Sequence, residues 1–405
     1  MSPVIIIGAG LAGWTTAREL RKLDSSTPIN LITADSGDFY AKPSLSNAFA
    51  QGKLPAQLVS TPAAKMAETL QVTLLPRTRV TAIHPSAKTV DTSAGVMDYR
   101  DLVLATGAQP IAFPLSGNAA LQVISVNSLE DFAQLHAQLQ PSATPADNRR
   151  RHVLIMGAGL IGCEFANDLA QAGYCVSAVD PGSRVLAALL PGCASAALGV
   201  ALERLGVRFY LGNTVRSVDF VASDPDGQQP MEVTLAGGER IVASCVLSAI
   251  GLRPDVSLAK DAGLVVERGI AVDWRLQTSA THIYALGDGA QYASAASTLS
   301  AHGTTLPYVM PILAAARALA ANLTGTATRL VFPLMPISVK TPALPLVVAA
   351  PQAGLPGSWA VAKTETGDDE AGIWHWTDAA GLKRGFVLAG AQTAQRQQQS
   401  KQLTP

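Results

Sequence analysis

The chain has 405 residues, enough for two or three domains, and its 30 basic and 30 acidic residues give a formal net charge of zero. Charged residues make up 15% of the chain, below the usual ~25%, so bulk charge indicates neither nucleic-acid binding nor attachment to an anionic membrane. No uninterrupted apolar stretch reaches the ~18 residues of a spanning helix, and we expect a cytoplasmic protein without a membrane span.

A glycine motif follows the first apolar run of the chain. Residues 4–7 are predicted to form a short buried strand, and Gly8, Gly10 and Gly13 follow with the spacing G-x-G-x-x-G before a helix-like run. In this motif the glycines permit a tight turn, close approach of the backbone to a pyrophosphate, and close helix–strand packing. Asp35, after the next strand-like run, is the acid expected to bind ribose hydroxyls.

The same pattern occurs a second time. The apolar run 153–156 precedes Gly157, Gly159 and Gly162, and Asp180 follows the strand-like run 176–179. One such motif is weak evidence, because glycines cluster in many turns. Two motifs, each with its acid, predict two bound dinucleotides, and the commonest reason for two is electron transfer between them.

Later segments extend this repeat. The apolar runs 102–105 and 246–250 each end near a glycine, Gly107 and Gly251, so we predict two copies of one supersecondary plan. Residues 283–287 form an apolar run that ends at Asp288, and residues 310–323 are predicted to be an alanine-rich helix. The tail from about 326 contains strand-like runs such as 344–348, and the last ten residues are expected to fray.

The cysteines exclude several redox mechanisms. The four cysteines, Cys163, Cys175, Cys193 and Cys245, form no C-x-x-C pair, so the sequence predicts no redox disulfide, metal site or iron–sulfur cluster. Cys163 lies inside the second glycine turn, where we interpret it as a small buried residue. A reducing compartment agrees with this usage.

Several segments together resemble the pyridine-nucleotide-disulfide oxidoreductase superfamily, and within it the flavin reductases that pass single electrons to small iron proteins. The resemblance covers nearly the whole chain and rests on residues 39–46, 101–107, 157–169, 205–209, 283–288, 308–311 and 339–342. It implies an α/β fold with two Rossmann-like dinucleotide-binding domains, one for FAD and one for NAD, and a small C-terminal α+β domain. The implied FAD domain comprises 1–115 and 246–325, the NAD domain 116–245 and the C-terminal domain 326–405.

The resemblance also implies roles for individual residues. FAD would be held by the first motif and its acid, with Lys42 and Pro43 beside the isoalloxazine ring, Thr106 and Gly107 against the nucleotide and Asp288 on the ribityl chain. NADH would be held by the second motif, with Asp180 on its adenosine ribose and Glu164 near the nicotinamide. Lys340 would reach the flavin from the tail.

This chain departs from the family pattern at two places. The disulfide-reducing and peroxidase branches carry cysteines near 42–48, whereas this chain has Ser44 and Ser46, so a thiol relay is not expected. Many ferredoxin reductases place a lysine where this chain has Asn47, and that lysine pairs with the nicotinamide-site acid. Lys42 or Lys340 is the candidate replacement. Each of these lysines could instead be an ordinary surface residue, and Glu164 could serve only the helix dipole.

The activity implied is NADH:rubredoxin electron transfer, with a hydride passing to the flavin and single electrons then passing to rubredoxin or a similar small iron carrier. Two alternatives remain: an NADH:ferredoxin reductase component of an oxygenase system, and a flavin- and NADH-dependent redox sensor. Asp180 favours NADH because it would repel a 2′-phosphate, while Arg184 nearby leaves NADPH open.

Overall fold

The computed structural model describes residues 2–139, 151–221, 229–293, 303–332, 334–352, 354–362 and 372–403. These residues form two compact units. Unit 1 comprises Met1–Ala41, Val59–Gln109 and Leu252–Pro333, and unit 2 comprises Lys42–Leu58, Pro110–Gly251 and Leu334–Pro405. Each glycine motif therefore lies in its own unit. Among the described residues, no helix is both long and apolar enough to cross a membrane.

Unit 1 is built on a five-stranded parallel sheet with the order β21-β9-β1-β2-β5. Its strands are β1 (Val4–Ile7), β2 (Ile29–Ile32), β5 (Thr73–Leu75), β9 (Asp101–Leu104) and β21 (Ile283–Ala285). All four residues of β1 and of β9 are buried, as expected for the central strands of a sheet covered on both faces.

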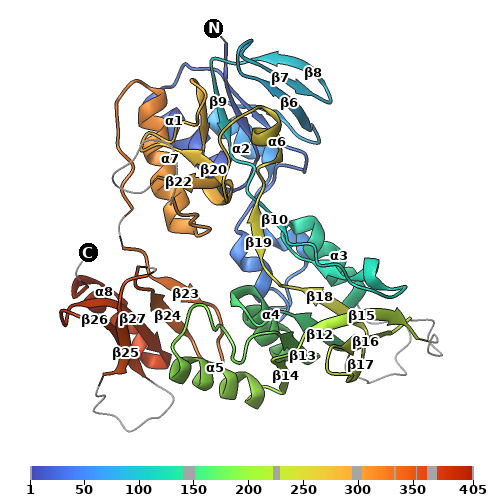
Figure 1. Ribbon diagram of the computed structural model, residues 1–405. Coiled ribbons are helices and arrows are strands. Elements are labelled where there is room, and N and C mark those ends of the chain that lie inside the picture. Colours follow the sequence, from blue (N-terminus) through green and yellow to red (C-terminus); the bar gives the residue numbers. More distant parts are fainter. Residues whose placement is uncertain are drawn as a thin grey trace. The chain divides into compact units, whose positions relative to one another are not determined.

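Helices α1 (Leu11–Leu23) and α7 (Val309–Leu323) pack side by side in unit 1 (Figure 1). Their buried faces carry small residues, including Ala12 and Ala17 in α1 and Ala315 and Ala316 in α7, which allow the two backbones to approach closely. The predicted helix over 310–323 is confirmed. Unit 1 also contains β3 (Phe39–Tyr40), β4 (Val59–Thr61), α2 (Ala63–Leu70), β6 (Val80–His84), β7 (Thr89–Thr92), β8 (Gly95–Asp98), β19 (Leu252–Pro254), α6 (Ser257–Asp261), β20 (Ile270–Val272), η4 (Gly287–Gly289) and β22 (Ala290–Tyr292).

Unit 2 repeats the sheet of unit 1. Its parallel sheet has the order β11-β18-β12-β13-β14, so each motif strand lies between the strand that follows it and the strand that closes its half. The predicted repeat of one supersecondary plan is confirmed. The elements are β11 (Ile124–Ser125), α3 (Leu129–Leu139), β12 (His152–Met156), α4 (Leu160–Gln171), β13 (Cys175–Asp180), α5 (Gly192–Arg204), β14 (Val207–Leu211), β15 (Val215–Phe220), β16 (Met231–Leu235), β17 (Arg240–Ala243) and β18 (Cys245–Ser248).

The C-terminal region of unit 2 is an antiparallel sheet with the order β23-β24-β27-β26-β25. It consists of β23 (Ile337–Val339), β24 (Leu346–Ala349), β25 (Gly357–Val361), β26 (Ile373–Asp378) and β27 (Lys383–Ala389), followed by η5 (Gly390–Gln395) and α8 (Arg396–Lys401). Residues of this sheet, among them Leu346, Trp374 and Val387, belong to the same apolar core as α4 and α5.

The expectation that the last ten residues fray is wrong for those that the structure describes. Residues 396–401 form α8, and Gln399 is buried with its amide oxygen 2.8 Å from Nε2 of His375 in β26. The polar composition suggested a solvated end. The hydrogen bond to His375 instead attaches the helix to the sheet. Composition alone cannot predict such a contact.

Segment 42–58 precedes β4 of unit 1 but groups with unit 2. It contains η1 (Lys42–Asn47) and η2 (Pro55–Leu58), and the remaining short elements of the chain are β10 (Ala108–Pro110) and η3 (Ala120–Gln122). Phe49 of this segment packs against Phe132 of α3 and Tyr174, with ring centroids 5.2 and 5.8 Å away. The segment that would carry the flavin-side residues is thus fixed to unit 2 by an aromatic cluster.

Candidate functional site

The first glycine motif forms a tight turn between β1 and α1. Gly8 has φ +109°, and a Cβ there would overlap the carbonyl oxygen of Ala105, while a Cβ on Gly13 would overlap the carbonyl oxygen of Gly8. Only glycine fits at either position. Gly10 differs, because it is exposed and a Cβ there would meet nothing within 4 Å. The protein itself therefore does not require glycine at position 10.

The second motif reproduces this geometry. Gly157 has φ +104° and approaches the carbonyl of Ala249, and a Cβ on Gly162 would overlap the carbonyl oxygen of Gly157. Gly159 is again exposed, with open space where a Cβ would lie. In both motifs the outer glycines close the turn and the middle glycine keeps its outer side clear.

Both turns suit a dinucleotide pyrophosphate. Gly10 and Gly159 are the N-cap residues of α1 and α4, and neither helix has a side-chain cap hydrogen bond at this end. The first N–H groups of each helix, together with its dipole, therefore point toward a space that a side chain at the middle glycine would fill. This arrangement fits phosphate groups and gives a physical reason for the middle glycine.

The two predicted ribose acids have different surroundings. Asp180 accepts hydrogen bonds from the N–H groups of Ala158 and Gly182, both at 2.7 Å. Its carboxylate therefore stabilises the backbone of the second glycine turn, which we call bracing of the turn. Asp35 accepts from the Thr33 hydroxyl at 2.6 Å and from Gly37 N–H at 2.9 Å, and it closes its own turn instead. The bracing by Asp180 was not anticipated from the sequence.

Arg184, the residue that left NADPH open, is engaged with the backbone. Its guanidinium donates to the carbonyl oxygens of Leu190 at 2.5 Å and Ala187 at 3.0 Å. An arginine that binds a 2′-phosphate must have donors directed outward. The carbonyl contacts occupy donors on both terminal nitrogens of Arg184.

Thr106, Gly107 and the Asp288 turn come together in unit 1. The Thr106 hydroxyl donates to the carbonyl oxygen of Asp255 at 2.9 Å, and a Cβ on Gly289 would lie 3.0 Å from the carbonyl oxygen of Gly107. Asp288 is half-buried in η4, three residues after the buried end of β21. The structure thus brings together the predicted residues that follow β9 and β21, at the carboxyl edge of the sheet where ligands of such folds bind.

Glu164 in α4 is a buried acid whose carboxylate has several polar partners. Its side chain is 2% exposed, and its Oε2 lies 2.7 Å from Nζ of Lys340 and 2.6 Å from the hydroxyl of Ser46. The backbone N–H of Lys340 donates to Oε1 at 3.0 Å. The acid therefore has a cation, and that cation comes from the C-terminal region.

The Lys340 ammonium is held by several acceptors besides Glu164. It donates to the Ser46 hydroxyl at 3.0 Å and to the carbonyl oxygen of Pro43. With its amide turned over, Asn47 also accepts from Nζ at 3.3 Å. The ammonium thus lies beside Asn47, the position at which the resemblance implied a lysine, and it supplies Glu164 with a cation that Asn47 does not.

Helix α4 holds both neighbouring segments through polar side chains on one face. Asp168, one turn after Glu164 and 2% exposed, accepts from the N–H groups of Phe49 and Ala50 at 2.9 Å each, and Asn167 accepts from Ala343 N–H at 3.0 Å. Burial raises the pKa of Asp168. Sequence reasoning missed this role, although acids at i and i+4 within an apolar helix were a visible signal.

Lys42 is exposed, and its Nζ donates to Asn127 Oδ1 at 3.2 Å; the adjacent Pro43 is also exposed. The structure therefore brings Pro43, Ser46, Glu164 and Lys340 into one cluster.

The two buried cysteines lie in surroundings that disfavour the thiolate. Cys163 is fully buried, its thiol donates to the carbonyl of Ala158 at 3.3 Å, and burial raises its pKa to about 12. Burial raises the pKa of Cys245 to about 12 as well, whereas Cys175 and Cys193 are exposed; all four are free. A thiolate is the reactive form, so neither buried cysteine is a redox nucleophile at neutral pH.

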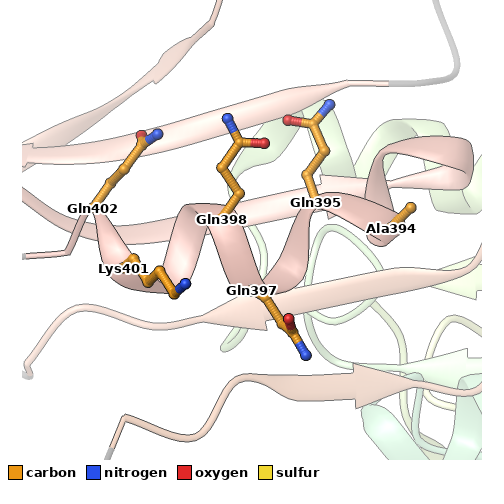
Figure 2. Close-up of a pocket in the computed structure, with 6 residues that line it drawn as sticks. All are labelled: Ala394, Gln395, Gln397, Gln398, Lys401 and Gln402. Atoms are coloured by element: carbon orange, nitrogen blue, oxygen red, sulfur yellow. The ribbon is translucent and has the colours of Figure 1, made fainter.

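Helix α8 carries a local polar and basic surface. A pocket of about 620 Å³ lies at this helix and is lined by Ala394, Gln395, Gln397, Gln398, Lys401 and Gln402. Figure 2 shows these six side chains. Lys383 of β27 reaches this surface through a 3.1 Å hydrogen bond to Gln402. The four acids between 363 and 371 lie outside the described residues. Lys383 and Lys401 therefore give this surface positive charge in a chain whose formal net charge is zero.

Comparison with known proteins defines the class. Residues 2–305 match the family described as pyridine nucleotide-disulphide oxidoreductase, and residues 329–403 match the rubredoxin binding C-terminal domain. The chain belongs to the pyridine nucleotide-disulphide oxidoreductase family.

Individual relatives narrow the comparison. The chain is similar to rubredoxin-NAD(+) reductase of Alcanivorax borkumensis, with 41% identity over 100% of this chain and 99% of the relative. It is 40% identical to the protein of the same name in Acinetobacter baylyi, over 100% and 98% of the two chains. Among solved structures it resembles a covalent putidaredoxin reductase–putidaredoxin complex, with a TM-score of 0.84, 26% identity and coverage of 98% and 92%.

Proposed function

We propose that this protein is an FAD-dependent NADH:rubredoxin oxidoreductase. The observation that carries the proposal is the presence of two glycine turns, each on its own Rossmann-like sheet, in one chain with a C-terminal region that matches a rubredoxin-binding domain. When bound, FAD supplies the ability to accept a hydride and to release its two electrons one at a time. The residues of this chain bind, orient and electrostatically support the reactants.

In unit 1, Gly8, Gly10 and Gly13 hold the FAD pyrophosphate at the start of α1, and Asp35 binds near the adenosine ribose. Thr106 and Gly107 lie against the flavin nucleotide, and Asp288 accepts a hydrogen bond from the ribityl chain. The open space at Gly10 and the convergence of the Thr106 and Asp288 turns support these roles.

In unit 2, Gly157, Gly159 and Gly162 hold the NADH pyrophosphate. Asp180 accepts a hydrogen bond from the adenosine ribose through carboxylate lone pairs that are not bound to backbone N–H groups. A carboxylate has about four acceptor sites and the backbone uses two, so the second role is compatible with the first. Asp180 supports a preference for NADH over NADPH, because its carboxylate would repel a 2′-phosphate.

Glu164 and Lys340 form the charged pair beside the nicotinamide. The buried carboxylate, held by Ser46 and Lys340, would orient the reduced nicotinamide, and the Lys340 ammonium would supply positive charge next to that carboxylate. Free thiols at all four cysteines support the inferred cytoplasmic location.

The visible spectrum of the purified protein, followed by stopped-flow reduction with NADH, tests this function. Oxidised rubredoxin and a 2Fe–2S ferredoxin are then added in separate experiments. A flavin spectrum with faster reduction of rubredoxin supports the proposal, and preference for the ferredoxin transfers it to an oxygenase system. A stable NADH–flavin complex with negligible turnover identifies a redox sensor instead, and a protein that takes up no FAD refutes the cofactor assignment.

A further inference from the structure

The turn that carries Asp288 packs closely against helix α1. Gly287 has φ +82°, and a Cβ there would lie 3.0 Å from the Cβ of Ala12 in α1. Its backbone must therefore keep a conformation that other residues rarely adopt. Asp288 follows directly, so its direction depends on how firmly Gly287 is held.

Tyr292 holds this glycine from the inside of unit 1. Its phenolic oxygen accepts a hydrogen bond from Gly287 N–H at 2.9 Å, and the hydroxyl lies 3.4 Å from the carbonyl oxygen of Gly287. One hydroxyl thus contacts both backbone polar groups of the residue before Asp288. The phenol is 3% exposed, and burial raises the pKa of Tyr292 well above its usual range, so the hydroxyl stays protonated and able to donate.

The ring of Tyr292 is itself fixed. Its centroid lies 4.9 Å from that of Phe332 in an edge-to-face arrangement, and its backbone N–H and C=O both pair with Thr304, at 2.9 and 3.0 Å. The hydroxyl is therefore held in a fixed position, and so is the Gly287 backbone to which it is hydrogen-bonded.

We propose that Tyr292 is a positioning residue for flavin binding: its hydroxyl fixes the backbone at Gly287 and thereby aims Asp288 at the ribityl chain of FAD. This assignment rests on the proposed function, because it requires FAD in unit 1. Tyr292 acts only through Gly287 and Asp288.

Tyr99 provides a matched control for the loss of a buried tyrosine hydroxyl. It lies in the same unit, is 2% exposed, and its hydroxyl has no hydrogen-bond partner among the described residues. Tyr292→Phe and Tyr99→Phe thus delete the same atom from equally buried rings, and only the first deletion removes a hydrogen bond to the Asp288 turn.

The experiment is titration of the FAD-free, full-length protein with FAD, followed by flavin fluorescence, for both variants. Tyr292→Phe should weaken FAD binding about tenfold, because Gly287 N–H loses its acceptor, whereas Tyr99→Phe should leave binding unchanged. Asp288→Asn completes a double-mutant cycle. In that background Tyr292→Phe should have little further effect, since both changes act through one side chain.

Two results overturn the assignment. They are equal FAD affinity in the two tyrosine variants and strictly additive effects of Tyr292→Phe and Asp288→Asn. If the unaltered protein takes up no FAD, the proposed function fails and this assignment fails with it.

Discussion

Replacing Lys340 by methionine removes the ammonium that contacts Glu164 and keeps a side chain of similar length. The carboxylate is 2% exposed, so the substitution leaves a buried charge without its cation. Breaking a buried ion pair costs about 3–5 kcal/mol. Two features place this case near 3 kcal/mol: Lys340 is 32% exposed, and Glu164 keeps the Ser46 hydroxyl and the Lys340 backbone N–H.

The assay is urea denaturation of the FAD-free protein at neutral pH, monitored by tryptophan fluorescence. Lys401→Met is the control, since it removes an exposed lysine of the same region and should change stability by less than about 0.5 kcal/mol.

Asn47 allows a rescue experiment. Its side chain lies within 3.3 Å of the Lys340 ammonium, so a lysine at position 47 can supply the cation from the other segment. Asn47→Lys should restore most of the stability lost by Lys340→Met, together with the rate of flavin reduction by NADH, which we expect the single variant to lose while FAD stays bound. A Lys340→Met protein as stable as the Lys401→Met control would refute the reasoning.

Four further predictions follow from the same structure. Gly10→Ala should fold normally but retain little FAD, because its Cβ enters only the space left for the ligand. Gly13→Ala should lower the melting temperature of the FAD-free protein, because its Cβ overlaps a carbonyl oxygen. Equal melting temperatures of the two FAD-free variants would contradict this. Asp180→Asn should destabilise the FAD-free protein by about 1–3 kcal/mol in urea denaturation, because one of two backbone N–H groups loses its acceptor; an unchanged midpoint would argue against bracing of the turn. Only the two exposed cysteines should react with Ellman's reagent before denaturation, and turnover should survive their modification; inactivation would indicate a thiol step. Lys401→Gln should raise KM for rubredoxin at low salt and have less effect at high salt, measured by steady-state kinetics; an effect independent of salt would exclude an electrostatic contribution of α8.

The two nucleotide turns were predictable from the sequence because their requirements are local. A positive φ at Gly8 and Gly157, and the contacts of Gly13 and Gly162 with the same turn, depend on a few consecutive residues. Parallel order of the strands follows from the alternation of strand and helix patterns. The absence of paired cysteines is likewise a property of the sequence alone.

The partners of the acids were decided only by the tertiary structure. Glu164 lies 118 positions from Ser46 and 176 from Lys340, and a pattern of residue types contains no distance between segments so far apart. The sequence therefore presented Glu164 without a cation and two lysines as candidates. Packing of η1 and of the end of β23 against α4 selects Lys340, because a carboxylate that loses its water on burial is stabilised only where a cation and hydrogen-bond donors converge on it.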